Sequence, residues 1–215
     1  MIVLKPLILF TGPDGAGKTT MALVLKKHLE KKGYKVKVVR IRGTHTLAYI
    51  LMLFLRDILG LRGRDLHYYN VRIPHKLIPL WTHIEFISLL PLILWYYYIL
   101  RVKYLIISER SIIDASVWLL PGIKEGNLSL KSGWIKLYLV LIGKYSKCTV
   151  YITAKLRTLE NRKPNEAFLV STMLPYYDAF AKIFQLKTID TSSNSIIASF
   201  KILLELLKEN YKELS

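Results

Sequence analysis

Nine consecutive residues near the amino end, GPDGAGKTT from Gly12 to Thr20, have the composition and spacing of a phosphate-binding loop. Glycines let backbone N–H groups turn inward on a β-phosphate, and a helix that begins at the loop adds its dipole. Lys18 is expected to reach the β- and γ-phosphates, and Thr19 to bind Mg²⁺. The residues predicted to bind ATP are Gly12, Pro13, Asp14, Gly15, Ala16, Gly17, Lys18, Thr19 and Thr20. The loop therefore predicts ATP and Mg²⁺ as cofactors.

A second charged pair, Glu109 and Arg110, follows the apolar run YLIIS at 104–108, which is typical of a buried strand. In open α/β sheets ligands bind beyond the carboxyl ends of the strands, so this pair is expected beside the loop. Glu109 could hold Mg²⁺ through water, and Arg110 could neutralise the oxygens of a transferring phosphoryl group. The alternative is a surface ion pair that caps the next helix.

Two arginines, Arg40 and Arg42, end the valine-rich run at 35–41 or follow it directly. A kinase that phosphorylates a hydroxyl group benefits from a carboxylate base that removes the proton of that hydroxyl. An acceptor that is itself a phosphate already offers an ionised oxygen and instead needs positive charge to bind it. The arginines favour a phosphate acceptor, whereas Asp14 acting as a base would serve a hydroxyl acceptor.

The elements that must position these residues alternate between two kinds along the chain. Apolar, β-branched or aromatic runs predict strands at 7–10, 35–41, 104–108 and 149–153. Helical spacing predicts helices at about 18–32, 47–60, 79–101, 130–145, 166–184 and 195–211, the first ending at Gly33. The alternation predicts an α/β fold of the P-loop NTPase type, with a doubly wound parallel sheet of about five strands and helices on both faces.

Two basic segments have no clear periodicity, 61–78 and 155–165. The second lies between a predicted strand and a predicted helix and carries four positive charges. It is predicted to be a short lid in which Arg157 or Arg162 folds onto the phosphates of ATP and excludes water. The alternative is a solvated basic loop.

The composition indicates one domain, residues 1–215, because 52% of the 215 residues are hydrophobic and no linker interrupts them. The formal net charge of +17 would attract nucleotides, nucleic acids or anionic membranes, or it reflects solvated lysines on helix faces. A single cysteine, Cys148, and the lack of a recognisable leader pattern fit a reducing cytoplasmic setting.

The apolar run at 84–100 is at the short edge of a membrane-spanning helix and contains Glu85 and Pro91. We expect it to be a core helix or part of a homodimer interface. Membrane insertion is not expected, although its aromatic residues 95–98 leave surface association open.

The loop GPDGAGKTT, followed by the strand-borne ERSIIDAS at 109–116, resembles the thymidylate kinases and the related deoxynucleoside kinases. The resemblance implies that Asp14 contacts the acceptor sugar and that Arg40 or Arg42 holds the acceptor phosphate. It also implies that the segment KTIDTS at 187–192 follows the last strand and packs near adenine.

The chain departs from that family in two places. Glu109-Arg110-Ser111 stands where thymidylate kinases have Asp-Arg-Tyr or Asp-Arg-His, and this is closer to the deoxynucleoside kinases. The family also has an arginine in the helix before this strand, with a phenylalanine that stacks on the base. Phe86 or Trp81 would supply the stack here, but the arginine, expected near Ser88, is missing. The predicted acceptor contacts are Arg40, Arg42, Phe86 and Ser111.

The hypothesis that joins these predictions is a kinase that transfers the γ-phosphoryl group of ATP to a deoxynucleoside monophosphate, dTMP giving dTDP. The residues predicted to be catalytic are Lys18, Arg110, Asp14 and Glu109, and those near Mg²⁺ are Thr19 and Glu109. The alternatives are a deoxynucleoside kinase and a P-loop protein without transferase activity that docks on membrane or nucleic acid. Under the main hypothesis neither a membrane nor a nucleic acid is a partner.

Overall fold

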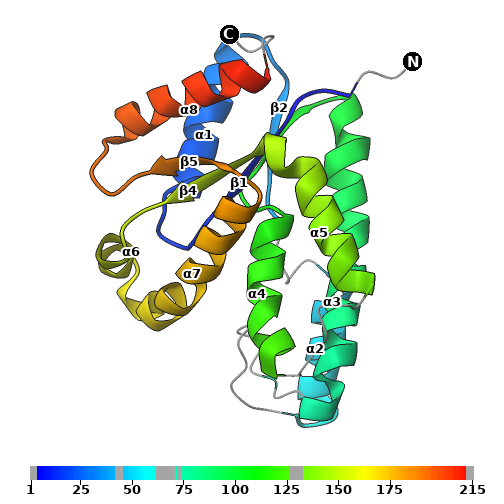
Figure 1. Ribbon diagram of the computed structural model, residues 1–215. Coiled ribbons are helices and arrows are strands. Elements are labelled where there is room, and N and C mark those ends of the chain that lie inside the picture. The colour runs from blue at the N-terminus through cyan, green and yellow to red at the C-terminus, as the bar shows by residue number, and fades with distance from the viewer. Residues whose placement is uncertain (1–3, 42–45, 62–70, 72–73, 126–132, 212–215) are drawn as a thin grey trace.

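A five-stranded parallel sheet forms the centre of the molecule, in a computed structural model that describes residues 4–41, 46–61, 71, 74–125 and 133–211. The strands lie in the order β2-β3-β1-β4-β5 (Figure 1). Their bounds are β1 Leu7–Thr11, β2 Val36–Val39, β3 Leu105–Ser108, β4 Thr149–Thr153 and β5 Lys187–Asp190. The prediction of a parallel α/β sheet of about five strands is confirmed.

Helices cover both faces of this sheet (Figure 1). Their bounds are α1 Lys18–Lys31, α2 Leu47–Asp57, α3 Ile78–Leu94, α4 Ile112–Glu125, α5 Gly133–Tyr145, α6 Leu156–Arg162, α7 Ala167–Ile183 and α8 Ile196–Asn210. β1 shows why both faces are needed, because its side chains alternate between two cores. Leu7 and Leu9 pack with α3, α4, α5 and α7, whereas Ile8 and Phe10 pack with α1 and α8.

The register of the sheet brings the predicted functional segments to one edge. Leu9 of β1 pairs with Ser108 of β3 on one side and with Thr149 of β4 on the other. The chain that leaves β1 becomes the glycine loop, and the chain that leaves β3 becomes Glu109 and Arg110. Both therefore emerge at the carboxyl edge of adjacent strands, as the sequence predicted.

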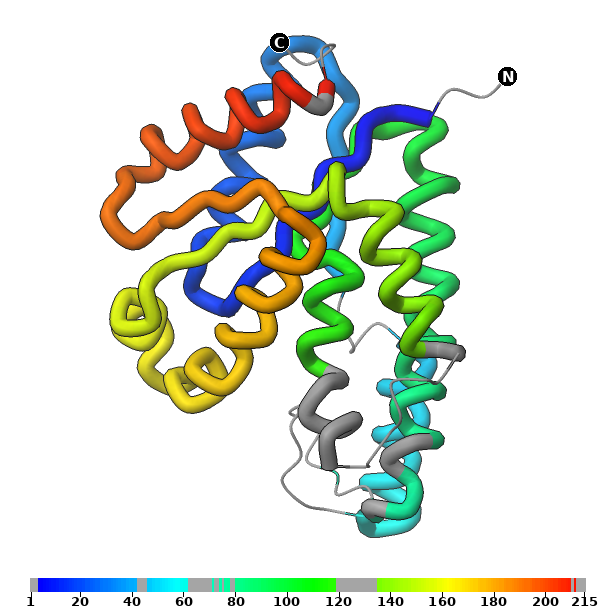
Figure 2. Tube along the Cα trace, viewed as in Figure 1, coloured from blue at the N-terminus to red at the C-terminus, as the bar shows by residue number. Residues whose placement is uncertain are grey.

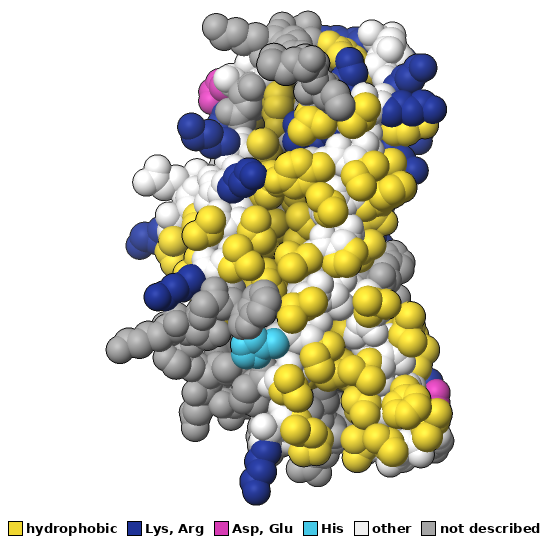
Figure 3. Space-filling view, turned by 90° about the vertical axis from the view of Figure 1, so that its right-hand side faces the viewer, with side chains coloured by type: hydrophobic (Ala, Val, Ile, Leu, Met, Phe, Trp, Pro, Cys, Tyr) yellow, Lys and Arg dark blue, Asp and Glu magenta, His cyan; other side chains and the backbone are white. Residues whose placement is uncertain are grey.

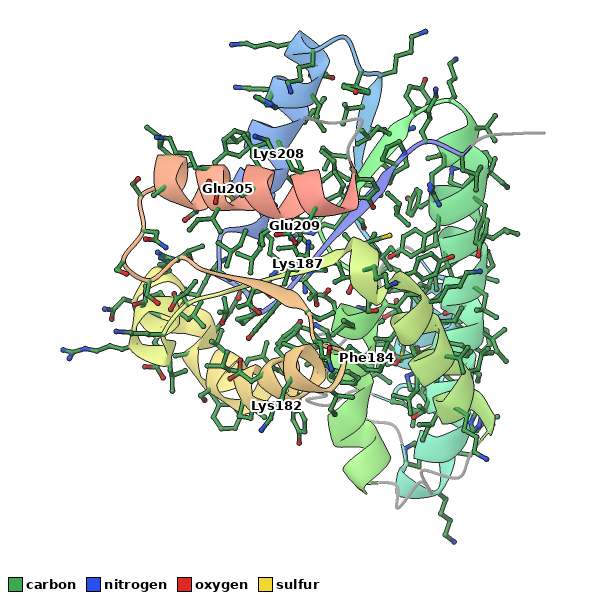
Figure 4. All side chains as sticks on the ribbon, turned by 45° about the horizontal axis from the view of Figure 1, so that its top comes forward. Lys182, Phe184, Lys187, Glu205, Lys208 and Glu209 are labelled. Atoms are coloured by element: carbon green, nitrogen blue, oxygen red, sulfur yellow. The ribbon has the colours of Figure 1, made fainter. Side chains whose placement is uncertain are left out.

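Local contacts fix the end of α1 and connect the edge strand β5 to α8. α1 ends as predicted at Gly33, whose φ of 88° suits glycine, and Tyr34 N–H donates back to the Leu29 carbonyl at 3.1 Å. Lys187 of β5 donates to the Glu209 carboxylate of α8 at 2.7 Å (Figure 4). The contact between Lys187 and Glu209 joins the edge strand β5 to the carboxyl-terminal helix α8.

α3 continues through a π-helical turn, Trp95–Ile99, and a 3₁₀ turn, Leu100–Val102. One side of this helix is buried through Phe86, Leu89, Ile93 and Tyr97. The other side belongs to a broad apolar surface (Figure 3). By length and composition alone, Leu80–Val102 is the one helix among the described residues that could cross a membrane. The expected core helix is confirmed for the buried side only.

Three segments differ from the sequence predictions. Residues 112–125 form α4, which was not among the predicted helices. Most of the segment 155–165, predicted to be irregular, forms α6 and the 3₁₀ turn Pro164–Glu166. Lys187–Asp190 is the last strand itself, so only the end of KTIDTS follows it. Most of the other basic segment, 61–78, lies outside the described residues.

Candidate active site

The glycine loop between β1 and α1 requires glycine for two different reasons. Gly12, Gly15 and Gly17 have φ values of 140°, 86° and 96°, which side-chain-bearing residues rarely adopt. At Gly12 a Cβ atom would also lie 2.0 Å from the Ile152 carbonyl oxygen of β4, whereas at Gly17 it would meet nothing within 4 Å. The loop therefore crosses the end of β4 in direct contact with its backbone.

Lys18 is the first residue of α1, and its side chain folds back over the loop. Its ammonium donates to the carbonyl oxygens of Gly12 at 2.5 Å and Pro13 at 2.7 Å, and lies 3.8 Å from Asp14 Oδ1. Burial and the charge of Arg110 lower the pKa of Lys18 to about 8. An anion bound in the loop would favour the charged ammonium, so the lysine is suited to a phosphate ligand.

Thr19 and Glu109 meet across the gap between α1 and β3. The Thr19 hydroxyl donates to Glu109 Oε2 at 2.9 Å, and Arg40 Nε lies 3.5 Å from the same oxygen. Hydroxyl and carboxylate oxygens are ligands that Mg²⁺ accepts, and in nucleotide enzymes it keeps several waters and binds the phosphates as well. No cluster of three or more His, Cys, Asp or Glu suited to a metal occurs in the described ranges.

Arg110 lies between two carboxylates. Its Nη2 donates to Asp14 Oδ1 at 2.6 Å, and its Nη1 lies 3.7 Å from Asp114 Oδ1. Burial would lower the pKa of Arg110, but the two carboxylates outweigh it and raise the pKa above its ordinary value. Burial would likewise raise the pKa of Asp14, but Arg110 and Lys18 together lower it. Arg110 Nε is buried and has no hydrogen-bond partner among the described residues.

Ser111 and Asp114 form a capping box at the start of α4. Asp114 Oδ2 accepts from the Ser111 N–H at 2.7 Å, and the Ser111 hydroxyl accepts from the Ile113 N–H at 3.0 Å. Ser111 is 2% exposed. The structure thus gives this serine a structural role, and its contact with an acceptor stays a prediction.

Of the two arginines left open in 155–165, Arg162 is the one that reaches the loop. Its guanidinium donates to the Gly15 carbonyl at 3.2 Å and to Thr191 Oγ1 at 3.0 Å, and the Thr191 hydroxyl donates to the Ala16 carbonyl at 3.0 Å. Figure 2 shows α6 (yellow) beside the loop after β1 (blue). Arg157, on the first turn of α6, is exposed. The predicted lid is therefore a helix joined to the loop at its end.

The two aromatic residues predicted to stack on the base are both buried. Phe86 is 1% exposed, with its ring centroid 3.9 Å from that of Tyr138 on α5. Trp81 is 6% exposed. A base could stack on either ring only after the surrounding core moved, so this contact stays a prediction. Arg42 lies outside the described residues.

Sequence reasoning missed several polar residues beneath the site. Asp114 is 1% exposed and accepts from the Tyr177 hydroxyl of α7 at 3.2 Å. The Tyr151 hydroxyl of β4 donates to Asp178 Oδ1 at 2.7 Å. Asp114 could have been found, because it follows Ser111 by three residues, the spacing of a capping box. The tyrosines carry no comparable signal.

Comparisons with known proteins bear on the glycine loop and on the fold. The adenylylsulphate kinase family model matches residues 5–46, which contain the glycine loop. No curated protein sequence matches the chain. The chain is similar in structure to a thymidylate kinase from Candida albicans, with a TM-score of 0.59, 16% identity and coverage of 99% of this chain and 94% of that one.

A thymidylate kinase from Ehrlichia chaffeensis is similar over 97% of this chain and 100% of its own, with a TM-score of 0.53 and 19% identity. The resemblance to thymidylate kinases predicted from the sequence is therefore confirmed at the level of the fold.

Proposed function

We propose that this protein is a nucleoside monophosphate kinase that transfers the γ-phosphoryl group of ATP to dTMP, forming dTDP and ADP. The observation that carries this proposal is that the two carboxylates at the site, Asp14 and Glu109, both lie beside cationic side chains. Glu109 is engaged by Thr19 and Arg40, and Asp14 by Arg110 and Lys18. A carboxylate that is paired with cations is a poor base for a sugar hydroxyl.

A monophosphate acceptor needs no such base, because its attacking oxygen is already ionised. It needs cations that bind it and screen its repulsion from ATP. Arg40, beside Glu109, and Arg110, beside Asp14, supply this positive charge. The geometry therefore favours dTMP over thymidine, although Glu109-Arg110-Ser111 resembles the deoxynucleoside kinases, which remain the alternative.

In the proposed mechanism this chain positions two anions and stabilises the charge that moves between them. Lys18 and the loop amides hold the β- and γ-phosphates, and Arg110 spans donor and acceptor. Arg40 binds the acceptor phosphate, and Asp14 accepts a hydrogen bond from its sugar. Mg²⁺, held by Thr19 and through water by Glu109, would neutralise phosphate charge.

Arg162 completes the donor side. Its guanidinium already bonds to the loop at Gly15, so a small shift of α6 would carry it onto the phosphates of ATP. An arginine in that place stabilises charge on the γ-phosphoryl group and helps to exclude water that would hydrolyse ATP.

We also infer that the enzyme is a homodimer that uses an apolar face of α2 and α3, referred to below as the α2–α3 face. Ile50 and Phe54 of α2 are 62% and 48% exposed, and Ile58, which follows α2, is 67% exposed. Leu80 and Leu94 of α3 are 58% and 55% exposed. Figure 3 shows hydrophobic side chains along this side of the molecule. Large exposed apolar patches mark interaction sites. Cytoplasmic location and the absence of membrane or nucleic-acid partners stay predictions.

Light scattering at micromolar concentration tests the dimer. Phe54→Asp should halve the mass, whereas the control Phe168→Asp, on α7 and 82% exposed, should not change it. A monomeric parent would refute the dimer without affecting the proposed chemistry.

A coupled ADP-release assay tests the activity, with Mg·ATP against a panel of nucleoside monophosphates and Lys18→Ala as the blank. We expect the highest kcat/KM with dTMP. Turnover with a different monophosphate would correct the base, and the absence of acceptor-dependent ADP release would refute the kinase.

A further inference from the structure

Asp114 is a buried carboxylate that the proposed mechanism does not use. It is 1% exposed, in the first turn of α4, and its two oxygens have separate partners. Oδ2 accepts from Ser111 and caps the helix, whereas Oδ1 faces Arg110 Nη1 at 3.7 Å and accepts from the Tyr177 hydroxyl at 3.2 Å. Of the two oxygens, Oδ1 is the one that faces Arg110.

Helix capping does not explain why a charged group is buried here. An asparagine oxygen would accept the same N–H bond without the desolvation cost that burial imposes on a carboxylate. Among the described residues, Arg110 is the cation that lies within ion-pair distance of this carboxylate, and the charge of Asp114 also favours the charged form of Lys18. The ion pair with Arg110 therefore explains the buried charge of Asp114 better than the capping of α4 does.

The two carboxylates beside Arg110 differ in what a substrate can do to them. Asp14 lies on the glycine loop with its side chain 25% exposed, where phosphates would compete for the guanidinium. Asp114 lies behind the arginine and cannot be reached by a substrate. Its contact with Arg110 can persist while the contact with Asp14 is exchanged for phosphate oxygens.

Tyr177 makes this anchor rigid. Burial and the neighbouring Asp114 raise the pKa of Tyr177 well above its ordinary value, so the hydroxyl remains a donor. Its ring stacks on Tyr151, with centroids 6.4 Å apart and planes 13° apart, and Tyr151 is held in turn by Asp178. The carboxylate is thus fixed from α7 and β4 as well as from α4.

We propose that Asp114, held by Tyr177, is a positioning residue that keeps the Arg110 guanidinium oriented between the donor and the acceptor phosphates. This inference rests on the proposed kinase activity. Asp114 touches neither substrate and acts through Arg110. A misplacement of such a group by about 1 Å can cost about a hundredfold in rate.

Steady-state kinetics of Asp114→Asn test this, because asparagine keeps an acceptor for the helix cap and removes the charge. We expect kcat to fall about 10- to 100-fold with KM for ATP within about threefold. Tyr177→Phe, which retains Asp114, should lower kcat by a smaller factor and serves as the second variant if Asp114→Asn does not fold. The control Ser116→Ala removes a hydroxyl bond to Ile112 within α4, away from Arg110, and should leave kcat near the parent value.

A double-mutant cycle separates positioning from a structural effect. In an Arg110→Ala background, Asp114→Asn should cause little further loss, because the group it positions is gone. An equal loss in both backgrounds, or kcat of both Asp114→Asn and Tyr177→Phe within twofold of the parent, would overturn the inference alone. A parent with no acceptor-dependent turnover would overturn the proposed function and this inference with it.

Discussion

Two substitutions in the glycine loop, Gly12→Ala and Gly17→Ala, should differ strongly in their effect on stability. Both residues have positive φ values, 140° and 96°, so alanine is strained at either position. At Gly17 nothing lies within 4 Å of the new Cβ atom, and the cost is this strain alone, about 1–2 kcal/mol.

At Gly12 the same methyl group would also lie 2.0 Å from the Ile152 carbonyl oxygen. The loop and β4 must then separate by about 1 Å, and overpacking of this kind costs about 1–3 kcal/mol in addition to the strain. We therefore expect Gly12→Ala to be less stable than Gly17→Ala by about 2 kcal/mol. For a chain of this length that is a difference of about 4–8 °C in Tm.

Thermal and urea unfolding of the two variants and the parent measure this difference. The urea m-value should stay unchanged, so that the midpoint reports stability. Equal losses in the two variants, or a greater loss in Gly17→Ala, would refute the contact between the loop and β4. Loss of nucleotide affinity in both variants would not refute this contact, because both glycines shape the phosphate-binding loop.

Three further predictions concern charged side chains at the site. Lys18→Ala should lower turnover by at least about a hundredfold without lowering Tm, because burial disfavours the charge that it removes; turnover within tenfold of the parent in the ADP-release assay would contradict its role. Arg162→Ala should raise KM for ATP severalfold and Arg157→Ala should not, because only Arg162 contacts the loop; equal changes would contradict this difference. The lowered pKa of Asp14 stabilises the fold above its ordinary value of 3.8, and this contribution is lost as the pH falls below that value. Asp14→Asn should therefore lose less stability than the parent between pH 5 and pH 3, and equal losses in urea unfolding would contradict the ion pair.

The parts of the site that follow from local spacing could be predicted from the sequence. The loop and Lys18 form one contiguous segment, and Glu109 follows a strand whose carboxyl end had to lie near the loop. Glu109 and Thr19 consequently meet at 2.9 Å, although 90 positions separate them in the chain. All five residues of β1 are buried, as expected for a central strand of a parallel sheet that is covered on both faces.

Contacts that depend on packing between distant helices could not be predicted. Arg157 and Arg162 are equivalent in sequence, and only the direction of α6 decides that Arg162 meets Gly15. The burial of Phe86 against Tyr138 depends on how α3 and α5 pack. The pairing of Tyr177 with Asp114 has no one-dimensional pattern, whereas the start of α4 does have a local signal, the Ser111–Asp114 capping box.

The most direct test of the central claim compares dTMP with thymidine as acceptor for Mg·ATP, with the products separated by chromatography. Because Asp14 and Glu109 are both paired with cations, the account predicts efficient formation of dTDP from dTMP and a kcat/KM for thymidine at least about a hundredfold lower. Formation of dTMP from thymidine at the higher kcat/KM would contradict it, and would mean that one of these carboxylates acts as a base.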